Sequence, residues 1–180
     1  MGKLYDSIDP RLQDLISKQH VFFVATAPLS ADGHVNLSPK GLDSFRVLGP
    51  RRVAYLDLTG SGIETVAHIR ENGRIVVMFC SFSGPPKIVR LHGRGTVILP
   101  GDPGFDSLLT QFPKHVGVRS VIAIDVERIS DSCGYGVPTY EFVGERNALA
   151  EWANRKTGEQ LESYRAETNA RSIDGLKGLG

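Results

Sequence analysis

Six separate runs rich in β-branched, aromatic and other apolar residues constrain the fold of this 180-residue chain more than any other feature. The runs cover residues 20–27, 34–38, 51–58, 74–82, 87–100 and 119–132. Gly, Pro, Asn or Asp residues, which favour turns, stand between most of them. Helical periodicity occurs between only a few of the runs, whereas a βαβ architecture needs a helix at every crossover. The pattern therefore predicts a mainly β, α+β fold built as a small barrel.

Short helices and an extension accompany the predicted barrel. Asp9 followed by Pro10 is typical of a helix N-terminus, and residues 63–73 have the apolar spacing of a helix that ends at a glycine. The strand pattern then stops after the sixth run, where helix-forming residues precede a Gly-rich tail. We expect a barrel domain over residues 1–132 and a helical extension over 133–180 that packs on this domain or on a partner subunit.

Composition and charge exclude several classes of function. The chain is 41% hydrophobic and 23% charged, and its formal net charge of +1 gives no reason to expect nucleic acid or an anionic membrane as a partner. No apolar run approaches the roughly 20 residues that span a bilayer, and the N-terminus lacks the apolar core of a secretory signal. We therefore expect a cytoplasmic protein. The two cysteines and five histidines show none of the spacings typical of metal sites, so no metal is expected.

The stretch NLSPK, residues 36–40, combines strand-forming and strand-breaking residues. Because Pro39 has no N–H for a sheet, the strand either ends in a turn here or presents Lys40 at its end. Asn36, Ser38 and Lys40 alternate and would share one face of a strand. That face is either a solvated sheet surface or a polar surface for an anionic or heterocyclic ligand.

A second stretch, DLTGSGIET at residues 57–65, leads from a strand through two glycines to a helix N-terminus. Free backbone N–H groups and the helix dipole make such a junction suitable for a phosphate. The alternative is an ordinary helix start, with Thr59 or Ser61 as the N-cap.

Three basic residues form the third polar stretch. Lys87 stands at the start of the fifth run, and Arg90 and Arg94 lie an even number of residues apart, so the two arginines share a face. They are either surface residues or, together with Lys40, ligands for a phosphate. No nucleophile–base pair can be identified, so no catalytic residue is assigned.

The order of these elements resembles the pyridoxamine 5′-phosphate oxidase-like, FMN-binding split-barrel family from Asp9 to Ile129. The motifs VNLSPKG, ENGRIVVMF and IVRLHGRG carry the resemblance. It implies a six-stranded split β-barrel with flanking helices that forms a homodimer, with FMN bound between the subunits. The family's lysine at the end of the second strand corresponds to Lys40, and its flavin-contacting strand corresponds to residues 54–57.

The chain departs from the family pattern at several positions. The two basic residues that bind the FMN phosphate are missing at residues 60–62, and the family's glutamine near the flavin ring falls on Ile88. The oxidase's C-terminal substrate motif has no match, so the chain resembles a branch other than the oxidase itself. The residues then expected to bind the cofactor are Asn36, Ser38, Lys40, Tyr55, Leu56, Gly60, Ser61, Gly62, Lys87 and Arg90.

The resemblance implies a flavin-dependent oxidoreductase that binds FMN and acts on a small-molecule substrate. One alternative is a reductase of the same fold that uses the deazaflavin cofactor F420. Another is a non-catalytic dimer that binds flavin or haem.

Overall fold

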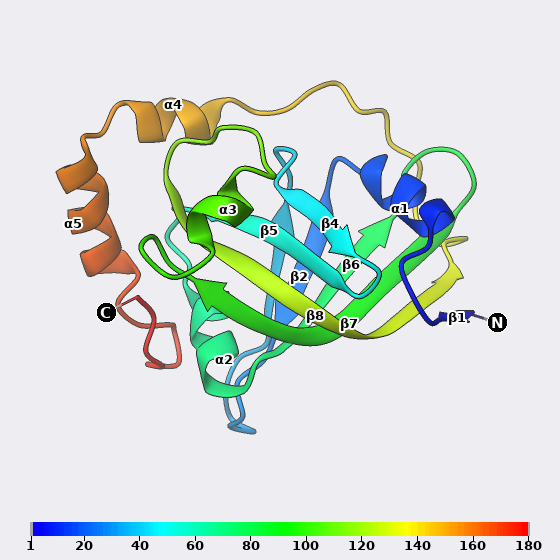
Figure 1. Ribbon diagram of the computed structural model, residues 1–180, viewed down its shortest axis with the longest axis horizontal. Helices are drawn as coiled ribbons and strands as arrows, with labels where there is room; N and C mark the ends of the chain where they lie inside the picture. Colours follow the sequence, from blue (N-terminus) through cyan, green and yellow to red (C-terminus); the bar gives the residue numbers. More distant parts are fainter. Residues whose placement is uncertain (1, 180) are drawn as a thin grey trace.

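The computed structural model describes residues 2–179, in which an antiparallel sheet curls into a barrel with helices around it (Figure 1). The strands are β1 (Leu4–Tyr5), β2 (Phe22–Thr26), β3 (Asn36–Lys40), β4 (Phe45–Gly49), β5 (Arg52–Leu58), β6 (Arg74–Cys80), β7 (Lys87–Ile98) and β8 (Val118–Cys133). The helices are α1 (Pro10–Ser17), α2 (Glu64–Asn72), α3 (Phe105–Leu109), α4 (Ala148–Asn154) and α5 (Gly158–Thr168). The predicted mainly β, split-barrel class is confirmed.

The strand order explains where the barrel is split. Along the sheet the order is β3-β2-β6-β7-β8-β5-β4, and β1 pairs with β8 outside this path. The ring of Phe22 on β2 nevertheless contacts Phe45 on β4 and Tyr55 on β5, with centroids 5.2 and 5.7 Å apart. Because these strands lie near opposite ends of the order, the sheet must close on itself between β3 and the β4–β5 side. All six predicted strands are present, and β1 and β4 are additional.

Two apolar clusters stabilise the barrel. The larger one fills the interior with the inward-facing residues of β2, β5, β6, β7 and β8, and it also takes the apolar faces of α1 and α2. Asp9 caps α1 as predicted, because its carboxylate accepts a hydrogen bond of 2.8 Å from the Leu12 N–H. Gly73, with φ at 71°, ends α2 in the left-handed conformation, again as predicted. The smaller cluster lies outside the barrel, where α3 covers β5 and β8.

β3 continues through Pro39 and ends at Lys40. Pro39 lies opposite Phe23 of β2, and β3 is an edge of the sheet, where a residue without an N–H is tolerated. A tight turn follows directly, in which Leu42 and Asp43 both have positive φ, at 61° and 50°. The two readings of this stretch therefore both hold in part: a turn follows the strand, and the strand presents Lys40 at its end.

The extension after β8 packs on the barrel of its own chain. It passes over the barrel as an irregular segment, and α4, α5 and the tail then lie beside the β5–α2 junction (Figure 1). The Asn169 side chain bonds the carbonyl of Gly60, and Arg70 of α2 bonds the carbonyl of Gly178. Contact of the extension with a partner subunit stays a prediction.

No helix between residues 2 and 179 has both the length and the apolar character needed to cross a membrane.

Candidate functional site

A buried ion cluster joins β3 to β5 at the split. The Asp57 carboxylate accepts hydrogen bonds from Nε and Nη2 of Arg119, at 2.6 and 3.2 Å, and from Ser120 Oγ at 3.0 Å. Lys40 Nζ lies 3.7 Å from the same carboxylate. The side chains of Asp57 and Arg119 are 1% and 4% exposed, whereas that of Lys40 is 23% exposed. One carboxylate thus faces two cations, and this excess of positive charge favours an anion beside Lys40.

The β5–α2 junction holds free backbone donors. Helix α2 starts at Glu64, and its N-cap Ile63 has no side-chain hydrogen bond, so Thr59 and Ser61 do not cap it. The Thr59 hydroxyl instead donates to the Gly117 carbonyl at 2.7 Å and accepts from Arg165 at 2.9 Å. The structure therefore contradicts the ordinary N-cap alternative, because these hydroxyls bond elsewhere or not at all.

Asn169 fixes the orientation of this junction. Its Nδ2 bonds the carbonyls of Gly60 and Ser61, at 2.9 and 3.2 Å. Within residues 2–179, the N–H groups of Gly60, Ser61 and Gly62 make no hydrogen bond of their own. Unpaired N–H groups ahead of a helix N-terminus are suited to bind a phosphate. The Glu64 carboxylate lies at the same end and accepts from the Ile173 N–H at 3.4 Å, so it partly opposes an anion.

The polar residues of β3 point inward and are hydrogen-bonded. Asn36 Nδ2 donates to Thr65 Oγ1 and Thr26 Oγ1, at 2.9 and 3.2 Å, and Asn36 Oδ1 accepts from Ser38 at 3.1 Å. Thr26 Oγ1 also lies 2.9 Å from Nδ1 of the fully buried His68. Burial lowers the pKa of His68, which fits a neutral ring that accepts the Thr26 proton. This face is not the solvated sheet surface that the sequence left open.

Some of these groups border a hollow at the start of β3. A hollow of about 540 Å³ is bordered by Asn36 of β3, Ser61 and Gly62 of the junction, and Ile173 of the tail. Lys40 lies at the other end of β3, a distance of about 13 Å along the strand, and lines a separate hollow. We call the hollow at Asn36, together with the inward face of β3 as far as Lys40, the split groove.

Most of the residues predicted to bind a cofactor meet at the split groove: Asn36, Ser38, Lys40, Gly60, Ser61 and Gly62. Tyr55 lies in the barrel interior with its hydroxyl buried and without a hydrogen-bond partner among the described residues, and burial raises its pKa. Leu56 points the other way, into the small cluster under α3. The sequence reasoning missed Asp57, Thr65, Arg119 and Asn169 as members of the site.

The structure separates Lys87 and Arg90 from Lys40. Lys87 Nζ pairs with Asp131 at 2.6 Å, and Arg90 donates to Ser132 Oγ at 3.0 Å. The register Pro39–Phe23–Met78–Arg90 puts Arg90 on the outer face of the sheet, whereas Lys40 is on the inner face. Three strand spacings, about 14 Å, lie between β3 and β7. Within one chain these residues therefore do not surround a common phosphate.

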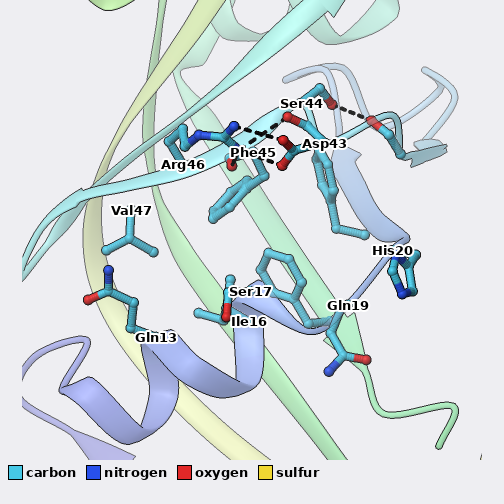
Figure 2. A pocket seen from close by; sticks show the side chains of 13 residues that line it. Gln13, Ile16, Ser17, Gln19, His20, Asp43, Ser44, Phe45, Arg46 and Val47 are labelled. Carbon is cyan, nitrogen blue, oxygen red and sulfur yellow. Dashed lines mark hydrogen bonds and ion pairs between the residues drawn. The ribbon is translucent and has the colours of Figure 1, made fainter. Parts of the chain in front are cut away.

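A small cavity of about 290 Å³ lies between α1 and β4. Figure 2 shows Phe45 directed from β4 toward Ile16 and Ser17, and Arg46 turned to Asp43. The Arg46–Asp43 pair, with a shortest distance of 2.7 Å, satisfies the charged groups of this cavity. The cavity therefore offers little to a charged ligand.

The closed sheet, the split beside its edge strand and the groove at that split define a split-barrel protein. The family model for pyridoxamine 5′-phosphate oxidase matches residues 8–133. The chain is 41% identical over 196 aligned positions to the pyridoxamine 5′-phosphate oxidase family protein ustO of Aspergillus flavus, covering 99% of this chain and 78% of that protein. This chain belongs to the pyridoxamine 5′-phosphate oxidase family.

Solved structures share the fold. A protein of Lactobacillus delbrueckii assigned to the pyridoxamine 5′-phosphate oxidases superimposes with a TM-score of 0.54 at 20% identity, over 71% of this chain and 98% of that one. An FAD-binding protein of Mesorhizobium loti has a TM-score of 0.50 at 14% identity, over 73% and 95%. At these identities the likeness establishes the barrel architecture.

Proposed function

We propose that the protein binds FMN in the split groove and acts as a homodimeric flavin-dependent oxidoreductase on a small substrate. The observation that carries the proposal is the coincidence, in a member of this family, of free N–H groups at residues 60–62 with Lys40 along the same groove. The FAD-binding protein of Mesorhizobium loti has the same architecture, which is consistent with a flavin.

The donors present fit an elongated ligand with a phosphate. The two basic residues of the family motif are absent from the junction, but the unpaired N–H groups of Gly60, Ser61 and Gly62 can donate to a phosphate in their place. Arg119 bonds the Gly60 carbonyl at 3.2 Å and adds positive charge behind the junction. Lys40, at the end of β3 away from Asn36 and with its ammonium 3.7 Å from Asp57, is then assigned to the ring end of the ligand.

A flavin in this groove supplies hydride transfer, and the chain's own residues orient it and hold charge around it. Asp57 keeps the Lys40 ammonium at the end of β3, where its charge stabilises an anionic ligand. Asn36 has its amide fixed by Thr65 and Thr26, so it forms a rigid wall of the groove. Asn169 keeps the junction carbonyls turned away from the ligand, which leaves the N–H groups free.

The homodimer in this proposal is supported by the outer face of β3, β2 and β6. Leu37 is 63% exposed, and Phe23, Ala25, Val76 and Met78 lie on the same face. A solvated face of an antiparallel sheet is usually polar, so an apolar outer face favours a partner. We further propose that the protein is cytoplasmic, which fits its two unpaired cysteines.

Purification of the protein and identification of its cofactor test the proposal. We expect a yellow protein that releases FMN on denaturation and sediments as a dimer. Lys40→Ala removes one charge-assisted contact and should weaken FMN binding about 10- to 100-fold. Lys114→Ala, at an exposed lysine that lines neither the hollow at Asn36 nor the one at Lys40, is the matched control and should leave binding unchanged. A protein stabilised by F420 alone, or by no flavin, would refute the proposal.

A further inference from the structure

A second hollow lies beyond Lys40, under the segment that connects β8 to α4. We call residues 134–147 the strap. The strap contains no helix or strand and crosses the top of the view in Figure 1 in yellow to orange. A hollow of about 850 Å³ lies between the strap on one side and the start of β2 and the end of β3 on the other. This volume is in the range of cavities that hold small molecules.

The strap rests on the barrel mainly through aromatic rings. Phe142 stacks on His20, with ring centroids 3.6 Å apart and planes at 4°. Tyr140 packs on Phe82 with a centroid distance of 5.4 Å, and its N–H donates to the Phe82 carbonyl at 2.9 Å. Within residues 138–147 this is the single hydrogen bond to the barrel. The hollow is therefore bordered by aromatic rings of both the strap and the barrel, and its roof has few directional bonds.

Charges of both signs line the same hollow. Lys40 and Arg146 are its cations near the strap, and Glu141 and Glu145 are its carboxylates. Lys40 shares its one carboxylate with Arg119. Among the described residues, Arg146 and the two glutamates form no ion pair, and Lys18, which also lines the hollow, is already paired with Asp14. A ligand complementary to these walls has a flat ring and carries both an anionic and a cationic group.

We propose that this hollow binds a zwitterionic aromatic compound of the size of an aromatic amino acid. Its ring packs against the two aromatic pairs, its carboxylate faces the two cations, and its ammonium faces the two glutamates. Because Lys40 borders both this hollow and the split groove, the ligand lies next to the proposed flavin site and is its substrate. The role as substrate rests on the proposed function, whereas the binding itself does not.

Calorimetry on the protein as isolated tests the binding with three matched probes. L-Phenylalanine carries both charges, phenethylamine lacks the carboxylate, and 3-phenylpropionate lacks the ammonium. We expect L-phenylalanine to bind about tenfold or more tightly than either of the others, because each missing charge removes one charge-assisted contact. Equal affinities for the three probes, or no binding of any of them, would overturn the proposal.

Four variants assign the contacts. Arg146→Gln should abolish the preference for L-phenylalanine over phenethylamine, and Glu145→Gln should reduce its preference over 3-phenylpropionate. Phe142→Ala should weaken the binding of all three probes. Tyr135→Ala is the control, since this strap residue is 84% exposed and does not line the hollow. Unchanged affinities in Phe142→Ala would overturn the site.

Flavin absorbance measured on the same samples separates the two proposals. If the Phe142→Ala protein keeps its flavin but no longer binds L-phenylalanine, both the flavin proposal and the hollow proposal are supported. A colourless protein that binds L-phenylalanine supports this site and refutes the cofactor. A yellow protein that binds none of the three probes refutes this site alone.

Discussion

Replacement of Asp57 by asparagine should destabilise the protein strongly, because it leaves Arg119 buried without its counter-charge. The carboxylate accepts two hydrogen bonds from Arg119 and one from Ser120, and its side chain is 1% exposed. Removal of one partner of a buried ion pair costs about 3–5 kcal/mol. Arg119 keeps two acceptors, Asn169 Oδ1 at 2.9 Å and the Gly60 carbonyl at 3.2 Å, so we expect the lower end of that range.

Urea unfolding and calorimetry measure this loss. About 3 kcal/mol in a chain of this size corresponds to a fall in Tm of roughly 6–12 °C. Asp43→Asn is the control, because Asp43 pairs with Arg46 at 2.7 Å but is 67% exposed, and exposed pairs contribute about 0–1 kcal/mol. A double-mutant cycle with Arg119→Gln should show a coupling free energy of about 1 kcal/mol or more. If Asp57→Asn lost no more stability than Asp43→Asn, Asp57 would not be the buried counter-charge that stabilises Arg119.

Two further predictions concern pH. Burial alone would raise the pKa of Asp131, but hydrogen bonds from Lys87, Tyr5 and the Lys3 N–H lower it to about 2. Its stabilisation is therefore present above the unfolded pKa of about 4 and is lost as the pH falls toward 2. In acid unfolding, the stability difference between the protein and Asp131→Asn should vanish over this window, and a constant difference would contradict the assignment. For His68, burial lowers the pKa, so the unfolded chain takes up the proton first and stability falls below about pH 6.5. His68→Gln should flatten this dependence in urea titrations at pH 5 and 7, and an unchanged slope would count against a neutral buried ring.

The barrel could be predicted from sequence because its signals are local. Each of the six runs became a strand, and the caps at Asp9 and Gly73 were correct because a cap depends on neighbouring residues. β4 was missed, since five residues after a tight turn carry little pattern of their own.

β3 shows why the site was only partly predictable. The alternation of Asn36, Ser38 and Lys40 correctly placed them on one face. The sequence does not show which face of β3 points into the barrel. Its polar residues point inward, whereas the apolar Leu37 points outward and is 63% exposed. The usual rule for a strand is thus inverted by a groove on one side and, in our proposal, a partner on the other.

The remaining site residues join through contacts distant in sequence. Arg119 reaches Asp57 across 62 residues because β5 and β8 pair in a register that sets Asp57 opposite Ser120. Asn169 reaches Gly60 across 109 residues. Contacts between residues so far apart cannot be predicted from the spacing or periodicity of a single sequence. The separation of Lys87 and Arg90 from Lys40 within one chain could not be predicted for the same reason, because a positive charge does not reveal which face of which strand a residue occupies.

The contact of Asn169 with the β5–α2 junction makes the extension a thermodynamic partner of the site. A ligand that uses the N–H groups of Gly60 to Gly62 binds best when Asn169 holds the carbonyls away. By linkage, the same ligand must then hold α5 and the tail against the barrel with equal free energy. Changes in the extension, far along the chain, can therefore tune ligand affinity without touching the ligand, and a bound ligand protects the extension from detachment.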